Sequence, residues 1–309
     1  MYNGFINLYK SPNISSNRAL SILKRALKQN NIVTKVGHFG TLDPIAEGVL
    51  PVALGRATRL FDYSLDKVKK YVATFRFGVE TDTLDHTGQV LSTGRSDVTI
   101  EEIESVIPNL IGIVDQVPPI YSAKTVKGVR AYKRARKGES FDLPAKTVRI
   151  FSIKLLKKIP NEQNGSDFVL EIECGGGTYI RSIVRDMAYL MGTVGIMSSL
   201  IRTQSGIFTA NNSISMENLE KNVVDFIIPM DVFLQDFPKI YLSNEQYTLL
   251  KNGLSVDFSC VSVQSDVDTC EKAFYTVYMP VPDVDPTQYE LMGVGEQKEG
   301  CLRLKTWLL

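Results

Sequence analysis

Two segments with apolar residues at every second position constrain the fold of this chain more than any other feature. Residues 71–77 read YVATFRF and residues 168–174 read FVLEIEC. This period of two predicts a β-strand with one well-buried face in each segment, because successive side chains of a strand point to opposite faces. Glycines 175–177 end the second strand, and the apolar spacing after them predicts a helix that opens at Thr178 and closes at Gly192.

Helix start signals predict two further helices in the first part of the chain. Ser15 precedes a run with leucines on one face, which predicts a serine-capped helix that ends near Asn30. Thr99 and Glu102 have the spacing of a capping box, which predicts a short helix up to Pro108.

The character of the sequence changes near Pro238, where we place a domain boundary. Beyond it, short strand-like pieces alternate with proline and glycine turns, without a long helical period. The predicted strands cover residues 273–279, 290–294 and 301–307.

The composition is that of an ordinary globular chain of 309 residues, with 44% hydrophobic and 22% charged residues. The longest apolar runs, such as residues 49–54, are far shorter than the roughly 20 residues of a membrane-spanning helix, and Met1 opens no signal pattern. Four cysteines lie far apart without a C-x-x-C pair, which indicates reduced thiols rather than a disulfide framework or a zinc site. We therefore expect a cytoplasmic protein that does not associate with membranes.

The charges are distributed unevenly along the chain. The first 158 residues hold 25 Lys and Arg against 14 Asp and Glu, a net charge of +11, whereas the rest holds 10 against 20, a net charge of −10. Screening cuts off interactions beyond about 8 Å at physiological ionic strength, so a basic half can bind phosphates whatever the total charge is. Nucleic acid is therefore a candidate partner.

Basic residues are densest between residues 118 and 146. Spacings of three and four place a set of them on one face of a predicted helix: Arg130, Lys133, Arg134 and Lys137. A solvated helix face would give the same pattern. The +11 charge of this half favours the interpretation as an RNA-binding insertion.

Three residues are candidates for chemistry. Asp43 stands in G-T-L-D-P, where the following proline favours an extended backbone and the nearby glycines let the loop approach a ligand. Arg181 lies near the start of a predicted helix, where a carboxylate partner is expected to hold it against the helix dipole. Taken singly, Asp43 could be a turn residue, Arg181 the partner of Asp186 or Glu173 in a surface ion pair, and Tyr71 a core aromatic.

Five motifs occur in a characteristic order: KVGHFGTLDPIAEGVLPVALGRATR from residue 35, KKYVA from 69, GVETDTLDHTG from 78, YSAKTVKGVRAYKRARKG from 121 and GGGTYIRSIVRD from 175. Together they resemble the bacterial tRNA pseudouridine-55 synthases of the TruB type, over a stretch from about Gly4 to Leu309. The resemblance implies an α/β (α+β) fold. A pseudouridine synthase core with a mixed, largely antiparallel sheet would occupy residues 1–238, including a tRNA-binding insertion at about 118–146. A small β-rich, PUA-like domain would occupy residues 239–309.

The resemblance also implies roles for individual residues. Asp43 corresponds to the catalytic aspartate, Tyr71 to the tyrosine that packs against the target base, and Arg181 to the arginine that pairs with the aspartate. The substrate-binding positions comprise the base-flipping histidine, an aspartate beside the tyrosine, two residues of the uracil pocket and a lysine near the N-terminal strand: His38, Asp85, Tyr179, Leu200 and Lys10. The insertion adds basic residues that would bind the RNA: Lys124, Arg130, Lys133, Arg134 and Lys137.

The sequence departs from the family pattern at three places near these motifs. Phe39 stands where the family usually has threonine, and Ser11-Pro12 replaces Lys-Pro. Gly175-Gly176 replaces Ser-Lys, which removes one cation near the site. None of these changes affects the aspartate, the arginine or the tyrosine.

The implied reaction converts uridine 55 in the T stem-loop of tRNA into pseudouridine. The bond from C1′ to N1 breaks, the uracil rotates and a bond forms to C5, so we expect neither a cofactor nor a metal, and water should be excluded. The base must first be flipped out of the loop. Attack at C1′, attack at C6 and a glycal route all stay open.

Two other functions are compatible with parts of the sequence. An idle RNA-binding module would keep the scaffold, but the intact Asp43, Tyr71 and Arg181 argue against it. A guide-dependent enzyme of a ribonucleoprotein would carry basic tails, which this chain lacks. We therefore expect a guide-independent monomer without an obligatory protein partner.

Overall fold

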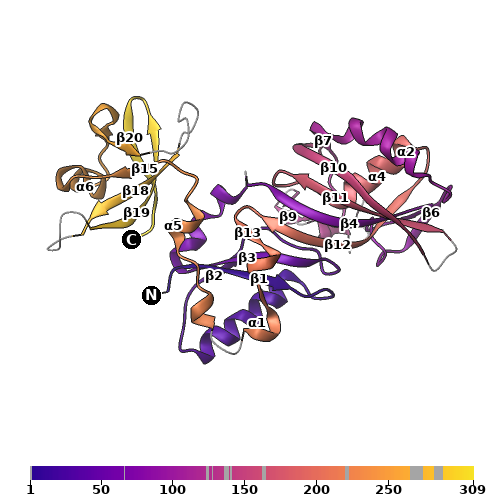
Figure 1. Ribbon diagram of the computed structural model, residues 1–309, viewed down its shortest axis with the longest axis horizontal. Helices are drawn as coiled ribbons and strands as arrows, with labels where there is room; N and C mark the ends of the chain where they lie inside the picture. The colour runs from indigo at the N-terminus through magenta and orange to yellow at the C-terminus, as the bar shows by residue number, and fades with distance from the viewer. Residues whose placement is uncertain are drawn as a thin grey trace.

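The computed structural model describes residues 2–65, 67–122, 125–126, 128–135, 139, 141–161, 165–219, 223–264, 274–281 and 288–309. Figure 1 shows two bodies: a larger one built on a long sheet, and a small β-rich one where the chain ends. Within these ranges no helix is long and apolar enough to cross a membrane.

The sheet of the larger body is mixed and largely antiparallel, as predicted. Its strands run in the order β14-β1-β3-β12-β4-β11-β10-β7, with β2 paired to β3 and β13 paired to β12. The pairs β1–β14 and β3–β12 are parallel, and the other pairs are antiparallel. In chain order the strands are β1 (Gly4–Lys10), β2 (Val36–His38), β3 (Glu47–Leu54), β4 (Lys69–Phe77), β7 (Gly112–Gln116), β10 (Lys146–Pro160), β11 (Ser166–Cys174), β12 (Gly195–Ser205), β13 (Phe208–Thr209) and β14 (Ile214–Ser215).

The two strands predicted from alternation are neighbours in the middle of this sheet. β4 and β11 pair in antiparallel register, with Tyr71 opposite Ile172 and Phe75 opposite Phe168. All four side chains are buried. The strand β3 differs, because it is apolar along nearly its whole length and both of its faces are covered. Leu50 and Val52 belong to the main core, whereas Val49 and Ala53 belong to an aromatic cluster on the other face.

Helices cover the main core, and their predicted caps are present. The Ser15 hydroxyl accepts the Arg18 N–H at 3.1 Å at the start of α1 (Ser16–Gln29). Thr99 and Glu102 form a reciprocal capping box on α2 (Ile100–Val106). The helix after the glycines is α4 (Ile180–Leu190), which begins two residues later than predicted because Tyr179 keeps an extended backbone as its N-cap.

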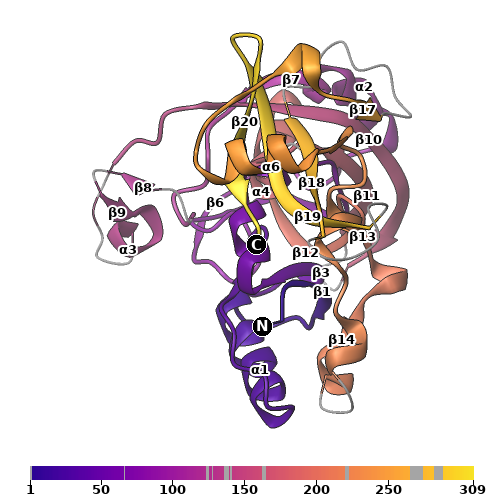
Figure 2. The same ribbon diagram turned by 90° about the vertical axis from the view of Figure 1, so that its left-hand side faces the viewer.

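The basic insertion differs from the single helical face that we predicted. Residues on either side of Gly128, whose φ is +79°, form a short hairpin of β8 (Thr125–Val126) and β9 (Val129–Arg130). Of the insertion residues that the structure describes, only Ala131–Ala135 (α3) are helical, and Arg130 lies on a strand, so the four basic residues do not share one helical face. The positive-φ turn at the glycine breaks the helix that the charge spacing suggested. Figure 2 shows this unit standing out from one side of the sheet. A second hairpin pairs β5 (Val79–Thr81) with β6 (Val90–Thr93).

The small body is a second sheet, which confirms the β-rich C-terminal prediction. Its strands are β15 (Lys239–Tyr241), β16 (Val256–Asp257), β17 (Val263–Gln264), β18 (Phe274–Pro280), β19 (Tyr289–Lys298) and β20 (Cys301–Trp307), in the order β16-β20-β19-β18-β15-β17. Its helix α6 (Asn244–Lys251) was not predicted, although Ser243 and Gln246 have capping-box spacing. The short helix α5 (Met230–Phe233) precedes this body.

Polar and aromatic contacts join the two bodies. The Tyr63 hydroxyl hydrogen-bonds the Thr306 hydroxyl at 2.8 Å, and the Arg59 guanidinium donates to the Trp307 carbonyl at 2.6 Å. Leu308 packs into the same aromatic cluster as Phe233. The C-terminal residues therefore take part in the packing of the larger body.

Candidate active site

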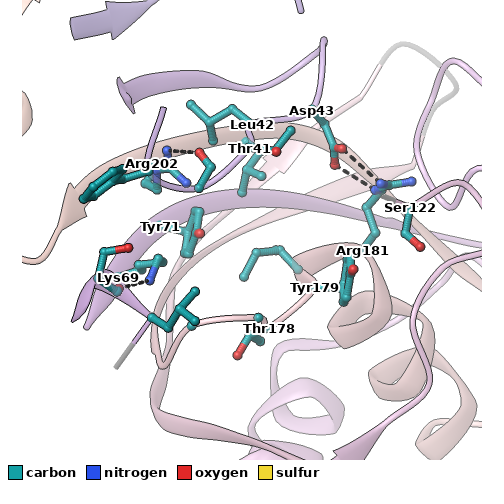
Figure 3. Close-up of a pocket in the computed structure, with 18 of the residues that line it drawn as sticks. Thr41, Leu42, Asp43, Lys69, Tyr71, Ser122, Thr178, Tyr179, Arg181 and Arg202 are labelled. Atoms are coloured by element: carbon teal, nitrogen blue, oxygen red, sulfur yellow. Dashed lines mark hydrogen bonds and ion pairs between the residues drawn. The ribbon is translucent and has the colours of Figure 1, made fainter. Parts of the chain in front are cut away.

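A pocket of about 340 Å³ opens between the loop after β2, the start of α4 and the central strands β4 and β12. Figure 3 shows its labelled side chains converging from these elements. The lining residues are Phe39, Gly40, Thr41, Leu42, Asp43, Phe61, Ser64, Leu65, Lys69, Tyr71, Ser122, Gly176, Gly177, Thr178, Tyr179, Ile180, Arg181, Leu200 and Arg202.

Asp43 and Arg181 form a two-pronged ion pair at the pocket (Figure 3). The Arg181 Nε lies 2.9 Å from one carboxylate oxygen of Asp43, and Nη2 donates to the other at 3.0 Å. The arginine side chain is only 6% exposed, whereas the carboxylate is 33% exposed. Remaining donors of the same guanidinium bind the carbonyls of Thr83 at 2.8 Å and Tyr121 at 3.0 Å. The carboxylate is thus held in a fixed orientation and still reaches the pocket.

Neighbouring elements fix the backbone of the loop on both sides of Asp43. Ser16, in the first turn of α1, bonds both the N–H and the carbonyl of Leu42 at 2.9 Å. The Lys10 ammonium donates to the Pro44 carbonyl at 3.3 Å, and Arg202 donates to the Gly40 carbonyl at 3.0 Å. Because the loop is fixed by hydrogen bonds before and after Asp43, the carboxylate can reach a bound substrate with little rearrangement of the loop.

Tyr71 and Leu200 supply the floor of the pocket from adjacent strands. Tyr71 is 7% exposed and Leu200 is 6% exposed. Burial raises the pKa of the Tyr71 phenol, and the nearby Arg202 guanidinium opposes this shift. An apolar floor with one aromatic ring suits a planar, uncharged ring such as a nucleobase.

Tyr179 is positioned by a side chain from a distant strand. The Gln116 amide accepts the Tyr179 N–H at 2.8 Å and donates to the Tyr179 carbonyl at 3.1 Å. The amide therefore satisfies backbone groups ahead of α4, where the N-cap side chain itself makes no capping bond. Burial raises the pKa of the Tyr179 phenol, so it is a neutral hydrogen-bonding group at neutral pH.

Comparisons with known proteins show the family of this chain. A model of the TruB family pseudouridylate synthase N-terminal domain matches residues 24–180, and a model of the tRNA pseudouridylate synthase B C-terminal domain matches residues 181–235. The chain is 39% identical to tRNA pseudouridine synthase B of Caulobacter vibrioides over 261 residues, covering 82% of this chain and 81% of that one. It is 38% identical to tRNA pseudouridine synthase B of Clostridium novyi over 309 residues, covering 99% and 100%. The chain belongs to the TruB family.

Solved structures share the TruB-family fold at lower sequence identity. A Cbf5-Nop10-Gar1 complex matches with a TM-score of 0.71 and 22% identity, covering 99% of this chain and 85% of that chain. An H/ACA RNP bound to a substrate RNA containing 2′-deoxyuridine matches with a TM-score of 0.69 and 21% identity, covering the same shares. These two likenesses concern the fold alone.

Asp85 lies behind Arg181 rather than in the pocket lining. Its side chain is 8% exposed, and one oxygen lies 4.0 Å from Nη1 of Arg181. The other oxygen accepts hydrogen bonds from the hydroxyls of Thr83 and Thr87 and from the Thr87 N–H, at 2.6 to 3.0 Å. This carboxylate therefore supports the arginine from the protein side.

His38 and Lys10 also lie outside the pocket lining of this TruB-family chain. His38 is the last residue of β2, opposite Val52, instead of part of a free loop. Its Nδ1 is buried without a hydrogen-bond partner among the described residues, and burial lowers the imidazole pKa. Lys10 is fully buried and binds the carbonyls of Ser11 and Ile14 at 2.9 and 2.8 Å as well as that of Pro44. Burial lowers its pKa to about 8. Their assignment as substrate-binding residues stays a prediction.

The structure describes little of the basic insertion beyond its backbone. Lys124 and Lys137 lie outside the described residues, and for Arg130 and Lys133 only the backbone is described. The Arg134 guanidinium forms an ion pair with Glu139 at 2.6 Å and lies 4.6 Å from the centre of the Phe141 ring. The role of this set in RNA binding stays a prediction.

The departures from the family pattern have a local structural basis. Phe39 is buried, and its ring centre lies 5.3 Å from that of Phe5 and 5.9 Å from that of Phe233, so it joins the aromatic cluster. At Gly176 an added side chain would collide with the Leu65 carbonyl. The Lys69 ammonium lies 3.3 Å from the point where that side chain would begin. A cation from β4 therefore occupies the neighbourhood of the lysine that the family usually carries at this position.

Sequence reasoning missed two cations of the pocket, Lys69 and Arg202. Each lies two positions from a residue that we did select, Tyr71 and Leu200 respectively. Residues two apart on a strand share a face, so the same alternation that placed the tyrosine and the leucine could have found both cations.

Proposed function

We propose that this chain isomerises uridine 55 in the T loop of tRNA to pseudouridine. The observation that carries the proposal is the carboxylate of Asp43, the one acid among the described lining residues, which a buried arginine holds in a fixed orientation at a pocket with an apolar floor. The names of the Caulobacter and Clostridium relatives support tRNA as the substrate.

The arrangement of carboxylates favours isomerisation over hydrolysis. A glycoside hydrolase needs two carboxyl groups beside the scissile bond, one of them to activate water. Here Asp85 is buried behind Arg181 and accepts hydrogen bonds from threonines, which leaves Asp43 as the acid among the described residues of the pocket lining. One carboxylate suffices when the detached uracil is itself the next nucleophile.

Each pocket residue has a distinct part in this proposal. Asp43 acts on the sugar or the ring, and Arg181 holds its carboxylate in a fixed orientation. Tyr71 and Leu200 hold the flipped base while it rotates. Tyr179 offers a neutral hydroxyl at the pocket wall beside Ser122, to which a polar edge of the base can bind.

Basic side chains at the pocket rim would hold the RNA backbone. The ammonium of Lys146, on an exposed stretch of β10, lies against Gly177 and fills space that a side chain at this position would occupy. Among the described residues Lys146 forms no ion pair, so its charge is available to a phosphate. We assign it, together with the insertion, to the phosphates next to the target nucleotide.

We further propose that the enzyme acts alone, as a monomer in the cytoplasm, and reads its site without a guide RNA. The net charge of +11 in the first 158 residues supports direct tRNA binding. The catalytic roles of Asp43, Tyr71 and Arg181 belong to this proposal.

The decisive experiment incubates the purified chain with an unmodified tRNA transcript and maps pseudouridine chemically. We expect one new pseudouridine, at position 55, without added RNA or protein. Modification only in the presence of a guide RNA would replace the proposal by the ribonucleoprotein alternative. Tight tRNA binding without any pseudouridine would favour the idle RNA-binding module.

A further inference from the structure

Arg202 is a buried cation of the pocket that the proposed roles leave unused. It is 1% exposed and lies on β12. Its Nε donates to the Val49 carbonyl at 2.7 Å, and its Nη2 donates to the Gly40 carbonyl at 3.0 Å. Within the described part of the chain it forms no ion pair with an Asp or Glu. Burying a guanidinium without a carboxylate partner is costly, which calls for a function.

The guanidinium also lies close enough to Tyr71 to act on its phenol. Arg202 and Tyr71 stand directly opposite each other on the antiparallel strands β12 and β4, a register that brings their side chains together on the pocket face. Figure 3 shows the two side chains adjacent, with Arg202 reaching on to the loop that carries Asp43. The arginine thus links the phenol, β3 and the catalytic loop.

The chemistry of the reaction requires a proton transfer at C5 of the base. Uridine carries hydrogen on C5, whereas in pseudouridine C5 bears the sugar and N1 bears hydrogen. Whichever way the glycosidic bond breaks, C5 must lose one proton after the new bond forms, and N1 must gain one. A phenolate that takes the C5 proton becomes a phenol, and it regains its charge when a proton passes to N1 or to solvent, so protons and charge balance.

We propose that Arg202 is a positioning residue that orients the Tyr71 hydroxyl and stabilises its phenolate form for removal of the C5 proton. The inference rests on the proposed function, because it assigns a step within that reaction. An arginine suits the role, since its planar guanidinium can donate to two backbone carbonyls and still place positive charge beside a third group.

The electrostatic surroundings of Tyr71 agree with this role. Burial raises the phenol pKa most strongly, and Arg202 lowers it both by its charge and as a hydrogen-bond donor. Cys174 on β11 and Asp43 on the loop face the phenol and raise the pKa. Lys69, on the same strand, lines the same pocket. Arg202 is the cation that directly opposes the effect of burial on this phenol.

The test compares Arg202→Gln and Arg202→Lys with wild type in single-turnover reactions on tRNA that carries either hydrogen or deuterium at C5 of the target uridine. We expect the Gln variant to react about a hundredfold more slowly, the order of a general-base contribution. We also expect its C5 isotope effect to exceed that of wild type, because C5–H cleavage then limits the rate. The rate of the Gln variant should rise more steeply with pH, since loss of the cation leaves the phenol harder to ionise. The Lys variant should show a smaller change in the same direction.

A matched control removes another arginine of the same sheet. Arg76 on β4 pairs with Asp167 at 2.8 Å and does not line the pocket. Arg76→Gln should lower the thermal stability and leave the isotope effect unchanged. If Arg202→Gln fails to fold, the Lys variant decides, because it keeps the buried charge but cannot serve the Val49 and Gly40 carbonyls and Tyr71 together.

The outcomes separate this inference from the proposed function. A wild-type enzyme that forms no pseudouridine would refute the function itself. An active wild type with Arg202 variants that are equally fast, or slower with an unchanged isotope effect, would refute the proton-transfer role and leave the function standing.

Discussion

Replacing Arg181 by lysine tests the geometry of its ion pair with Asp43. The guanidinium makes two contacts with Asp43, at 2.9 and 3.0 Å, and two with the carbonyls of Thr83 and Tyr121, at 2.8 and 3.0 Å. A lysine carries a single nitrogen on a shorter reach, so it cannot serve both carboxylate oxygens and both carbonyls. The variant keeps the positive charge and loses the two-pronged contact with the carboxylate.

The size of the effect follows from the number of lost bonds. A hydrogen bond to a charged group contributes about 1.5–3 kcal/mol. Loss of one or two of them at Asp43 should weaken transition-state stabilisation by about 3 kcal/mol, which corresponds to a roughly hundredfold lower rate. Binding of tRNA should change only a few-fold, because the phosphate contacts are elsewhere.

Single-turnover release of tritium from tRNA labelled at C5 of uridine measures the rate, and filter binding measures the affinity. Arg185→Lys serves as a matched control on the same helix, because Arg185 pairs with Asp186 at 2.7 Å and does not contact Asp43. We expect this control to stay within about threefold of wild type, because Arg185 neither lines the pocket nor contacts Asp43. A rate within a few-fold of wild type for Arg181→Lys would show that the forked contact is not used in catalysis.

Four further predictions follow from the same contacts. Asp43→Asn should abolish pseudouridine formation and leave tRNA affinity within a few-fold, and substantial turnover would remove the carboxylate from the reaction. Lys146→Gln should reduce the slope of log K against log salt by about 0.7–0.9, with the exposed Lys154 as the control substitution, and an equal slope would exclude a phosphate contact. Truncation after Pro238 should lower the melting temperature, because it removes the Trp307 and Thr306 contacts. The slope of log K for tRNA binding against log salt should stay the same, because residues 240–309 carry 5 basic against 10 acidic side chains. A much shallower slope would contradict this. Burial lowers the Lys10 pKa to about 8 in the folded chain, so above that pH the unfolded chain keeps a proton on this lysine that the folded chain has lost. The free energy of unfolding should therefore rise between about pH 8 and 10.5, and denaturant titrations should show a larger rise in wild type than in Lys10→Met. Parallel profiles would contradict the pKa shift.

Local sequence signals predicted the central strands and the capped helices well. The alternation in residues 71–77 and 168–174 and the caps at Ser15 and Thr99 act within a few residues, so neighbouring positions suffice to reveal them. The prediction of secondary structure failed where two local signals, the spacing of basic residues and a glycine turn, favoured different structures. The spacing of basic residues suggested a helix through Arg130, but the positive φ at Gly128 makes a hairpin there.

The candidate site shows the limit of local signals most clearly. Considered alone, Arg181 was expected to pair with Asp186 or Glu173 at the surface. In the structure Asp186 pairs with Arg185 and Glu173 with Lys70, and Arg181 turns to Asp43. Only the order of the motifs, through the family resemblance, pointed to that pair in advance.

The sequence by itself determined which segments become strands and helices, which half is basic, and, through its motifs, the family to which the chain belongs. Only the tertiary structure decided that Arg202 faces Tyr71, that Ser16 and Lys10 hold the loop of Asp43, and that Lys69 lies next to Gly176. Most of these contacts join residues far apart along the chain. They form because strand pairing and core burial bring distant side chains together, and no pattern within a short window of sequence encodes that choice.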